Sequence, residues 1–223
     1  MLEDWWPLFG LVLRTPRVEL RLPREPEVVA LAELAADGVH APGERPFLTP
    51  WTEAGPLARA REVLGGHWER MADWQPEVWR LGLGVFGVDD GEPRGMVTLR
   101  ATEFASRREV STSSWLGLAH HRRGYGTQAR VALLTLAFDH LGAACATTEV
   151  FPDNAASQGV SRALGYEHDG ISRDVREGEV LVSDRLRLWR TTWDEPDRRA
   201  TRPAVQVLGL QPCRELFGLA DPS

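Results

Sequence analysis

The sequence contains no lysine, because all 26 of its basic residues are arginine. This absence excludes the Walker phosphate-binding loop, which requires the motif GK[ST]. Cysteine is also scarce: Cys145 and Cys213 are the only two, and they lack the spacing of a metal-binding pair. We therefore expect no metal site, and we expect Cys145, which lies in an apolar run, to be a buried thiol.

A basic surface and a long apolar segment are lacking as well. The formal net charge of −6 disfavours a nucleic-acid-binding face, which is usually basic. Glu3 and Asp4 near the start disfavour a signal peptide, and no long uncharged apolar segment follows them. We expect a cytoplasmic protein that binds neither nucleic acid nor membrane, and a chain of 223 residues that forms one domain with a full core.

The most informative stretch runs from Ser114 to Leu141. Residues alternate with a period of two from Glu109 to Leu118, which predicts a strand, and the period becomes helical from Thr127. Between the two lies a turn with two glycines and two arginines, Arg122-Arg123-Gly124-Tyr125-Gly126-Thr127. Such a turn at a helix N-terminus can point backbone N–H groups at an anion, so we expect a phosphate to bind there. A Rossmann fingerprint is excluded, because no third glycine follows near Val131.

Three segments in order resemble the GNAT acyltransferases, in the branch that contains the ribosomal-protein N-terminal acetyltransferases. The first, residues 15–21, is TPRVELR and resembles the first strand of that branch. The second, residues 121–126, is HRRGYG and resembles the acyl-coenzyme A loop, with His121 in place of the usual first residue. The third begins as DNAAS at residue 153 and ends as ALGY at residue 166. WPLF near the start, SWLGL, and CRELFG near the end are similar to an actinobacterial subgroup.

This resemblance implies an α/β fold in which a mixed, mostly antiparallel sheet is flanked by helices and splays at the acyl-CoA site. Patterning predicts the same order of elements, with strands at 11–22, 81–88, 95–104, 109–118, 144–151, 170–176 and 180–189. Helices are predicted at 25–36, 56–73, from 127 to 141, and at 155–164. We expect a catalytic domain over residues 1–193. Residues 194–223 should form a linker and a tail that adds an edge strand or contacts a partner subunit of a homo-oligomer.

The resemblance also implies site residues. The amides of Leu116 and Leu118 are expected to stabilise the oxyanion that forms when an amine attacks the thioester. Ser157 matches the serine that protonates the departing thiolate, and Asn154 matches the residue that bonds the pantetheine arm; both would also serve as helix-capping residues. The residues expected to hold the coenzyme phosphates are Arg122, Arg123, Gly124, Tyr125, Gly126 and Thr127.

A general base is less well defined. Glu103 is the first candidate, because it follows a strand predicted to adjoin the cleft, and Glu109 and His120 are the others. Four residues are candidates for lining the acceptor site or for plain core packing: His40, Phe47, Trp51 and Trp68.

The predicted function is transfer of an acyl group from acetyl-CoA or succinyl-CoA to a primary amine by direct attack. The acceptor amine belongs to a protein N-terminus, a lysine or a small molecule such as an antibiotic or polyamine. The alternative of a different class is a non-catalytic acyl-CoA-binding protein.

Overall fold

The computed structural model describes residues 1–176 and 178–219. Within them, one mixed sheet has the strand order β7-β8-β6-β5-β4-β3-β2-β1-β9, and every neighbouring pair is antiparallel except β5 and β6. The strands are β1 (Val12–Arg14), β2 (Val18–Arg21), β3 (Val78–Gly87), β4 (Pro93–Thr102), β5 (Glu109–Leu116), β6 (Cys145–Val150), β7 (Glu167–Arg176), β8 (Glu179–Trp189) and β9 (Gln206–Leu208). The expected α/β fold with a mostly antiparallel sheet is confirmed.

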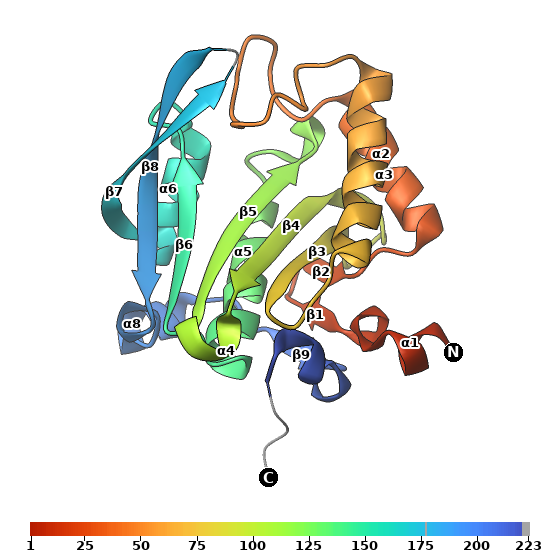
Figure 1. Cartoon of the computed structure of the whole chain (residues 1–223), viewed down its shortest axis with the longest axis vertical. Helices are drawn as coiled ribbons and strands as arrows, with labels where there is room; N and C mark the ends of the chain where they lie inside the picture. Colours follow the sequence, from red (N-terminus) through yellow and green to blue (C-terminus); the bar gives the residue numbers. More distant parts are fainter. Residues whose placement is uncertain (177, 220–223) are drawn as a thin grey trace.

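Helices cover the two faces of this sheet unequally (Figure 1). The helices are α1 (Leu2–Trp5), α2 (Glu25–Asp37), α3 (Pro56–Ala72), α4 (Phe104–Arg107), α5 (Tyr125–Thr135), α6 (Ala155–Leu164), α7 (Arg190–Trp193) and α8 (Pro196–Thr201). Short 3-10 turns occupy Pro7–Gly10, Leu118–His120, Gln211–Cys213 and Glu215–Phe217, and α5 continues as a π-helical turn over Leu136–His140. No helix in the described part of the chain is long and apolar enough to span a membrane.

The core is divided by the sheet. On one face, α5 packs against the main apolar cluster, which includes Leu83, Val97 and Val110 from the strands. On the other face, α2 and α3 pack over the middle strands through Leu31, Val63 and Phe86. Figure 1 shows no helix in front of β5, β6 and β8 on this second face, so its floor is left open. We call this uncovered part the open face.

Two sequence predictions need correction in the first third of the chain. The strand predicted at 11–22 is broken into β1 and β2 by a turn at Thr15, whose backbone N–H donates to the Val18 carbonyl 2.9 Å away. In α3, Trp68 was a candidate for core packing or for the acceptor wall, but its side chain is 62% exposed. The helix instead buries Val63 and His67.

The described residues from 206 to 219 pack into the same core as the rest of the chain. β9 pairs with β1 and forms an edge of the sheet, as the tail was expected to do. Phe217 and Cys213 are fully buried, and the Trp74 indole donates to the Leu216 carbonyl at 2.9 Å. The segment predicted as a linker, from residue 194 onward, instead contains α8, which lines a pocket together with the end of α6.

Candidate active site

The central feature of the site is a split between the parallel strands β5 and β6. Their ladder pairs Glu109 with Cys145 and ends where Ser111 pairs with Thr147. One further link follows, from the Thr148 hydroxyl to the Thr112 carbonyl at 3.0 Å. Beyond that link β5 continues to Leu116 while paired only with β4. The two strands therefore separate toward their carboxyl ends, and Figure 1 shows them diverging.

The split leaves backbone N–H groups of β5 without a neighbouring strand. The Gly117 amide donates to the Arg94 carbonyl of the β4 side at 2.9 Å. Because successive N–H groups of a strand alternate between its two edges, the Leu116 and Ser114 amides point toward the split. An N–H group in this position can stabilise negative charge on a carbonyl oxygen held between the strands.

The second amide expected to do so is not available in this structure. The Leu118 N–H donates to the Gly38 carbonyl at 3.0 Å, which joins the end of β5 to the end of α2. The expectation for Leu118 is therefore corrected, whereas that for Leu116 agrees with its direction. Leu118 lies in a 3-10 turn, where strand alternation no longer applies, and this is why its position in the motif was misleading.

The predicted phosphate loop connects this turn to α5. Arg122 and Gly124 both adopt left-handed conformations, with φ of 56° and 78°, and α5 begins at Tyr125. The first intrahelical bond of this turn joins the Gln128 N–H to the Gly124 carbonyl at 3.2 Å. The earlier amides of Tyr125, Gly126 and Thr127 are the N–H groups that a helix leaves unpaired at its start, and they can bind an anion.

Contacts that the sequence did not predict hold this loop in place. The Arg17 guanidinium donates to the Arg123 carbonyl at 2.5 Å and lies 4.7 Å from the centre of the Tyr125 ring. Gln128 of α5 accepts hydrogen bonds through Oε1 from the Thr15 hydroxyl at 2.7 Å and from the Arg17 amide at 3.1 Å. The segment Thr15-Pro16-Arg17 therefore supports the phosphate loop and is not part of a strand.

His121 has a part of its own in this support. Its Nε2 lies 3.1 Å from the Leu116 carbonyl, so the side chain ties the loop to the end of β5. This contact explains how a histidine can occupy the first position of the loop motif: the ring stabilises the turn, while the backbone remains directed at the anion site.

The start of α6, which follows β6, lies on the other side of the split. The Asn154 side chain accepts a hydrogen bond from the Ser157 amide at 3.1 Å, so the helix-capping role expected for this pair is present. Ser157 is half-buried in the first turn, directly after the end of β6. Because β5 and β6 are parallel, the helices that follow them begin at the same edge of the sheet, beside the split.

Two of the candidate bases lie at the opposite end of the sheet. Leu116 pairs with Gly95, and Glu103 follows the far end of β4, eight residues further on. Glu109 is the first residue of β5 and is equally far from Leu116. The expectation that Glu103 adjoins the cleft is therefore corrected. Both glutamates flank the short connection between β4 and β5. This connection lies at the start of β5, whereas the split lies at the end of β5.

His120 is the candidate that stays near the phosphate loop. Its ring lies 6.2 Å from the Tyr125 ring. Burial lowers the pKa of His120, and the nearby charges of Arg94 and Arg123 lower it further. The imidazole is therefore neutral at pH 7 and able to accept a proton.

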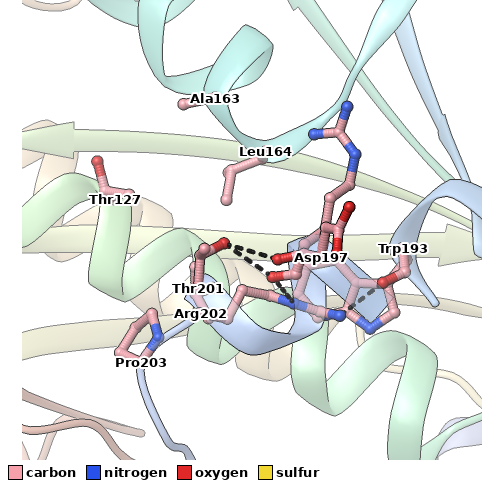
Figure 2. Close-up of a pocket in the computed structure, with 10 residues that line it drawn as sticks. Thr127, Ala163, Leu164, Trp193, Asp197, Thr201, Arg202 and Pro203 are labelled. Carbon is pink, nitrogen blue, oxygen red and sulfur yellow. Dashed lines mark hydrogen bonds between the residues drawn. The ribbon is translucent and has the colours of Figure 1, made fainter. Parts of the chain in front are cut away.

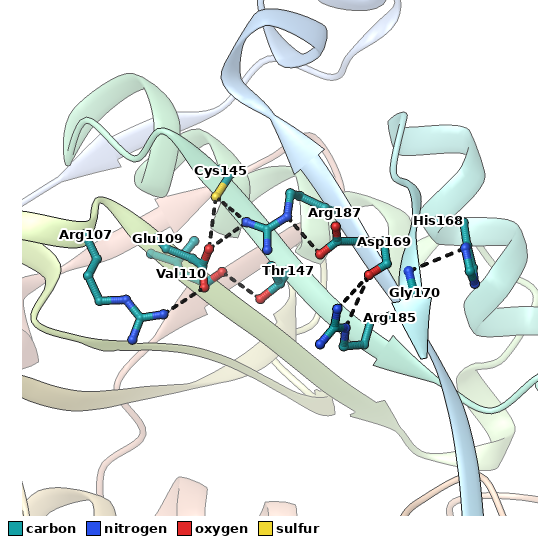
Figure 3. Close-up of polar contacts among 10 residues, drawn as sticks. All are labelled: Arg107, Glu109, Val110, Cys145, Thr147, His168, Asp169, Gly170, Arg185 and Arg187. Atoms are coloured by element: carbon teal, nitrogen blue, oxygen red, sulfur yellow. Dashed lines mark hydrogen bonds and ion pairs between the residues drawn. The ribbon is translucent and has the colours of Figure 1, made fainter. Parts of the chain in front are cut away.

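Glu109 belongs instead to a polar network at the paired end of β5 and β6 (Figure 3). Arg187 of β8 donates to Glu109 at 2.6 Å, to Asp169 at 2.9 Å and to the Cys145 sulfur at 3.0 Å. Burial would raise the pKa of Glu109, but the hydrogen bonds from Arg187 and Cys145 hold it below its ordinary value. Burial and the adjacent Glu109 raise the pKa of the Cys145 thiol, which is buried as expected.

An aromatic cluster lies where the acceptor wall was expected. Phe47 and Trp51 lie 5.5 Å apart, and Trp51 meets Trp115 of β5 at 5.6 Å. His40 joins the two ends of this loop, because its Nε2 is 2.8 Å from the Thr52 hydroxyl. Trp68 is exposed and away from the cluster. The loop at residues 39–52 is therefore a packed wall beside the last turn of β5.

A pocket of about 280 Å³ lies between α5, α6 and α8 (Figure 2). Thr127, in the first turn after the phosphate loop, is at one side, and Arg202 is at the other. The Arg202 guanidinium lies 3.6 Å from the centre of the Trp193 ring and donates to the Trp193 carbonyl at 2.5 Å.

Within the described residues no group of three His, Cys, Asp or Glu side chains is placed to hold a metal ion.

A split parallel pair, a strand amide directed into the split and a helix start with unpaired amides form the geometry expected for an acyl-coenzyme A-dependent transferase. The chain belongs to the acetyltransferase (GNAT) family, whose domain profile matches residues 17–167. The solved structures support the same fold. A GCN5-related N-acetyltransferase from Brucella melitensis has a TM-score of 0.65 at 18% identity, covering 85% of this chain and 84% of that one.

Two of the similar structures were solved with forms of coenzyme A. RimJ from Mycobacterium smegmatis, in complex with a CoA disulfide, has a TM-score of 0.64 at 16% identity, covering 88% of this chain and 97% of its own. RimL, a ribosomal L7/L12 α-N-protein acetyltransferase in complex with coenzyme A, has a TM-score of 0.62 at 18% identity, covering 80% and 97%. At these identities the likeness establishes the fold, and family membership supports acyl transfer from coenzyme A.

Proposed function

We propose that this protein transfers an acetyl group from acetyl-CoA to the N-terminal amine of a polypeptide. The observation that carries the proposal is the direction of the Leu116 amide into the split, between the starts of α5 and α6. The name of the structural neighbour RimL, an α-N-protein acetyltransferase, favours an N-terminal amine over other acceptors.

In the proposed reaction, the neutral amine attacks the thioester carbonyl carbon, and a C–N bond forms. The carbonyl oxygen takes up the negative charge, which the Leu116 N–H stabilises. Collapse of this intermediate breaks the C–S bond, and the Ser157 hydroxyl gives its proton to the departing thiolate. The amine loses a proton to solvent, and Ser157 regains a proton from solvent. A protein α-amine has a pKa of about 7.7 to 8.0, so a part of it is neutral near pH 7 without a strong base.

The coenzyme would be held mainly by backbone. The amides of Tyr125, Gly126 and Thr127 and the charges of Arg122 and Arg123 would bind its phosphates. Asn154 would contact the pantetheine arm. No side chain of this set distinguishes acetyl-CoA from succinyl-CoA, so both donors belong in the test.

The test is release of free thiol from acetyl-CoA or succinyl-CoA in the presence of peptides, polyamines and aminoglycosides. Peptide-dependent release with a product acylated at its N-terminus is expected. Ser157→Ala should lower kcat about tenfold to a hundredfold, because a positioned proton donor is lost. Ser106→Ala, an exposed serine of α4 at the other end of the sheet, is the control and should leave kcat unchanged.

Three outcomes would contradict parts of the proposal. Transfer to a small amine but to no peptide would overturn the acceptor. Release with succinyl-CoA alone would overturn the donor. Tight CoA binding without release for any amine would favour a binding protein that does not catalyse transfer.

A further inference from the structure

Arg70 is a cation that the described part of the structure leaves without an anion. It lies on the last turns of α3 and is half-buried, yet no described residue forms a hydrogen bond or ion pair with its guanidinium. Its nearby acids are already engaged, because Glu69 and Asp73 both pair with Arg80, at 3.2 Å and 3.0 Å. Burial lowers the pKa of Arg70, and the charge of Arg80 lowers it further, whereas the adjacent Glu69 carboxylate raises it.

The sheet has a place made for this side chain. A Cβ atom at Gly82 would lie 2.4 Å from Arg70 Nε, and the three nearest atoms to it all belong to Arg70. Gly82 lies in the middle of β3, where glycine weakens a strand and commonly marks a close approach. The missing side chain therefore allows the guanidinium to lie directly on the sheet.

This position lies on the same face of the sheet as the open face, where α3 covers β3. Gly82 pairs with Thr98, and Thr98 pairs with Ser113, so the three residues form a row across β3, β4 and β5. Cross-strand partners point to the same face, and this is the face on which Trp115 meets the acceptor wall. Arg70 therefore lies at one side of the floor over which an acceptor would approach the split.

Two further arginines lie on this face of the sheet. Arg100 is exposed and donates to the Ser111 hydroxyl at 2.8 Å, and Arg185 is exposed and donates to the Asp169 carbonyl at 2.8 Å. Neither forms an ion pair with a described acid, and Glu149 is the one exposed carboxylate between them on β6. Arg185 lies opposite Glu149 in the β6–β8 register, whereas neither cross-strand partner of Arg100 is an acid.

We propose that Arg70 binds a carboxylate of the acceptor, and that the acceptor is a peptide with an acidic residue at its third to fifth position. This inference rests on the proposed function. Along β5, Leu116 is three residues from Ser113, or about 10 Å. Across the sheet, the split lies between two and three strand spacings from β3, or about 12 Å. The diagonal is roughly 15 Å. An extended peptide rises about 3.4 Å per residue, so its fourth side chain reaches this distance, whereas the carboxylate of a free amino acid does not.

The experiment moves one glutamate through positions 2 to 8 of an otherwise neutral peptide and measures kcat/KM for acetyl transfer. The expected result is an increase of about tenfold with glutamate at positions 3 to 5 relative to glutamine there. Arg70→Gln should remove this increase through KM, and it should leave transfer to the glutamine peptide and the KM for acetyl-CoA unchanged. Arg61→Gln, an exposed arginine on the same helix, is the matched control.

Gly82→Ala keeps the charge but displaces the guanidinium, so it should also abolish the preference. Equal use of acidic and neutral peptides, or equal loss on both with Arg70→Gln, would overturn the proposal. Preference for free glutamate over the peptides would overturn the peptide as the source of the carboxylate.

Calorimetric binding of the acidic peptide to CoA-saturated protein separates this inference from the proposed function. If no amine is acetylated, the transferase proposal fails. Binding that is weakened about tenfold by Arg70→Gln would then still support the carboxylate site, whereas unchanged binding would overturn it.

Discussion

The two ends of the β5–β6 pair differ in how completely their hydrogen bonds are formed. At the amino-terminal end of both strands, which is the lower end in Figure 1, the strands are paired. There Arg187 of β8 contacts Glu109 of β5, Cys145 of β6 and Asp169 of β7. At the upper end the ladder stops, and the Leu116 amide and two helix starts face the space between the strands. The lower end is built from side chains that stabilise the sheet, and the upper end from backbone groups that remain free.

This contrast shows how the fold can form a reaction site without ordering further side chains. Backbone donors need no rotamer to be fixed, so they are positioned before a ligand arrives. The paired end supplies the rigidity that keeps the other end apart. We therefore expect substitutions at the upper end to change catalysis or binding, and substitutions at the lower end to change stability alone.

The largest effect is expected for Leu116→Pro, which removes the N–H that points into the split. Proline costs no ladder bond here, because this N–H faces away from β4, and the preceding strand residue suits a proline. Loss of one oxyanion donor should lower kcat about 100-fold to 1,000-fold, with little change in CoA affinity. Leu116→Ala retains the amide and loses only the side chain, so a comparable loss in this control would refute the role of the N–H.

Next in size is Gly124→Ala at the phosphate loop. Its φ of 78° costs an L-residue about 1 to 2 kcal/mol, and relaxation of the turn would redirect the amides that follow it. We expect CoA affinity, measured by calorimetry, to fall about tenfold or more. Gly91→Ala carries the same backbone penalty at a φ of 72° in the β3–β4 hairpin, and it should not affect binding. Equal effects from both would assign the loss to stability.

The upper end was largely predictable from sequence, because its signals are local. Gly124 and Gly126 between a strand and a helix predict an exposed turn of amides, and Asn154 with Ser157 predicts a capped helix. The element borders follow from the same periodicity, and α6 has the predicted bounds. These features depend on residues a few positions apart.

The parts that were not predicted depend on long-range direction. Glu103 was predicted to adjoin the cleft, but the antiparallel order of β4 and β5 places both Glu103 and Glu109 at the opposite end of the sheet. One sequence signal was available: both residues flank the short connection that leads into β5. They therefore lie near the start of β5 and not near the split at its end. The partnership of Arg70 with Gly82 spans two elements, and its one sequence signal was a glycine inside an apolar strand.

The smallest effect is expected at the lower end, for Glu109→Gln. The carboxylate accepts a hydrogen bond from Arg187 and is 27% exposed, so its loss should lower the free energy of unfolding by about 1 to 2 kcal/mol at pH 7. The pKa of Glu109 is held below its ordinary value of 4.5, so the carboxylate stabilises the fold above that pH and this contribution is lost as the pH falls through the lowered value.

Urea unfolding should therefore show a gap between wild type and Glu109→Gln that is full at pH 7 and shrinks between about pH 5 and pH 3. Glu62→Gln, an exposed residue of α3, is the control and should show no gap at either pH. Acetyl transfer at pH 7 should be unchanged. A fall in kcat with Glu109→Gln would mean that the Arg187 network also sets the angle at which β5 and β6 separate, and the two ends would then act as one unit.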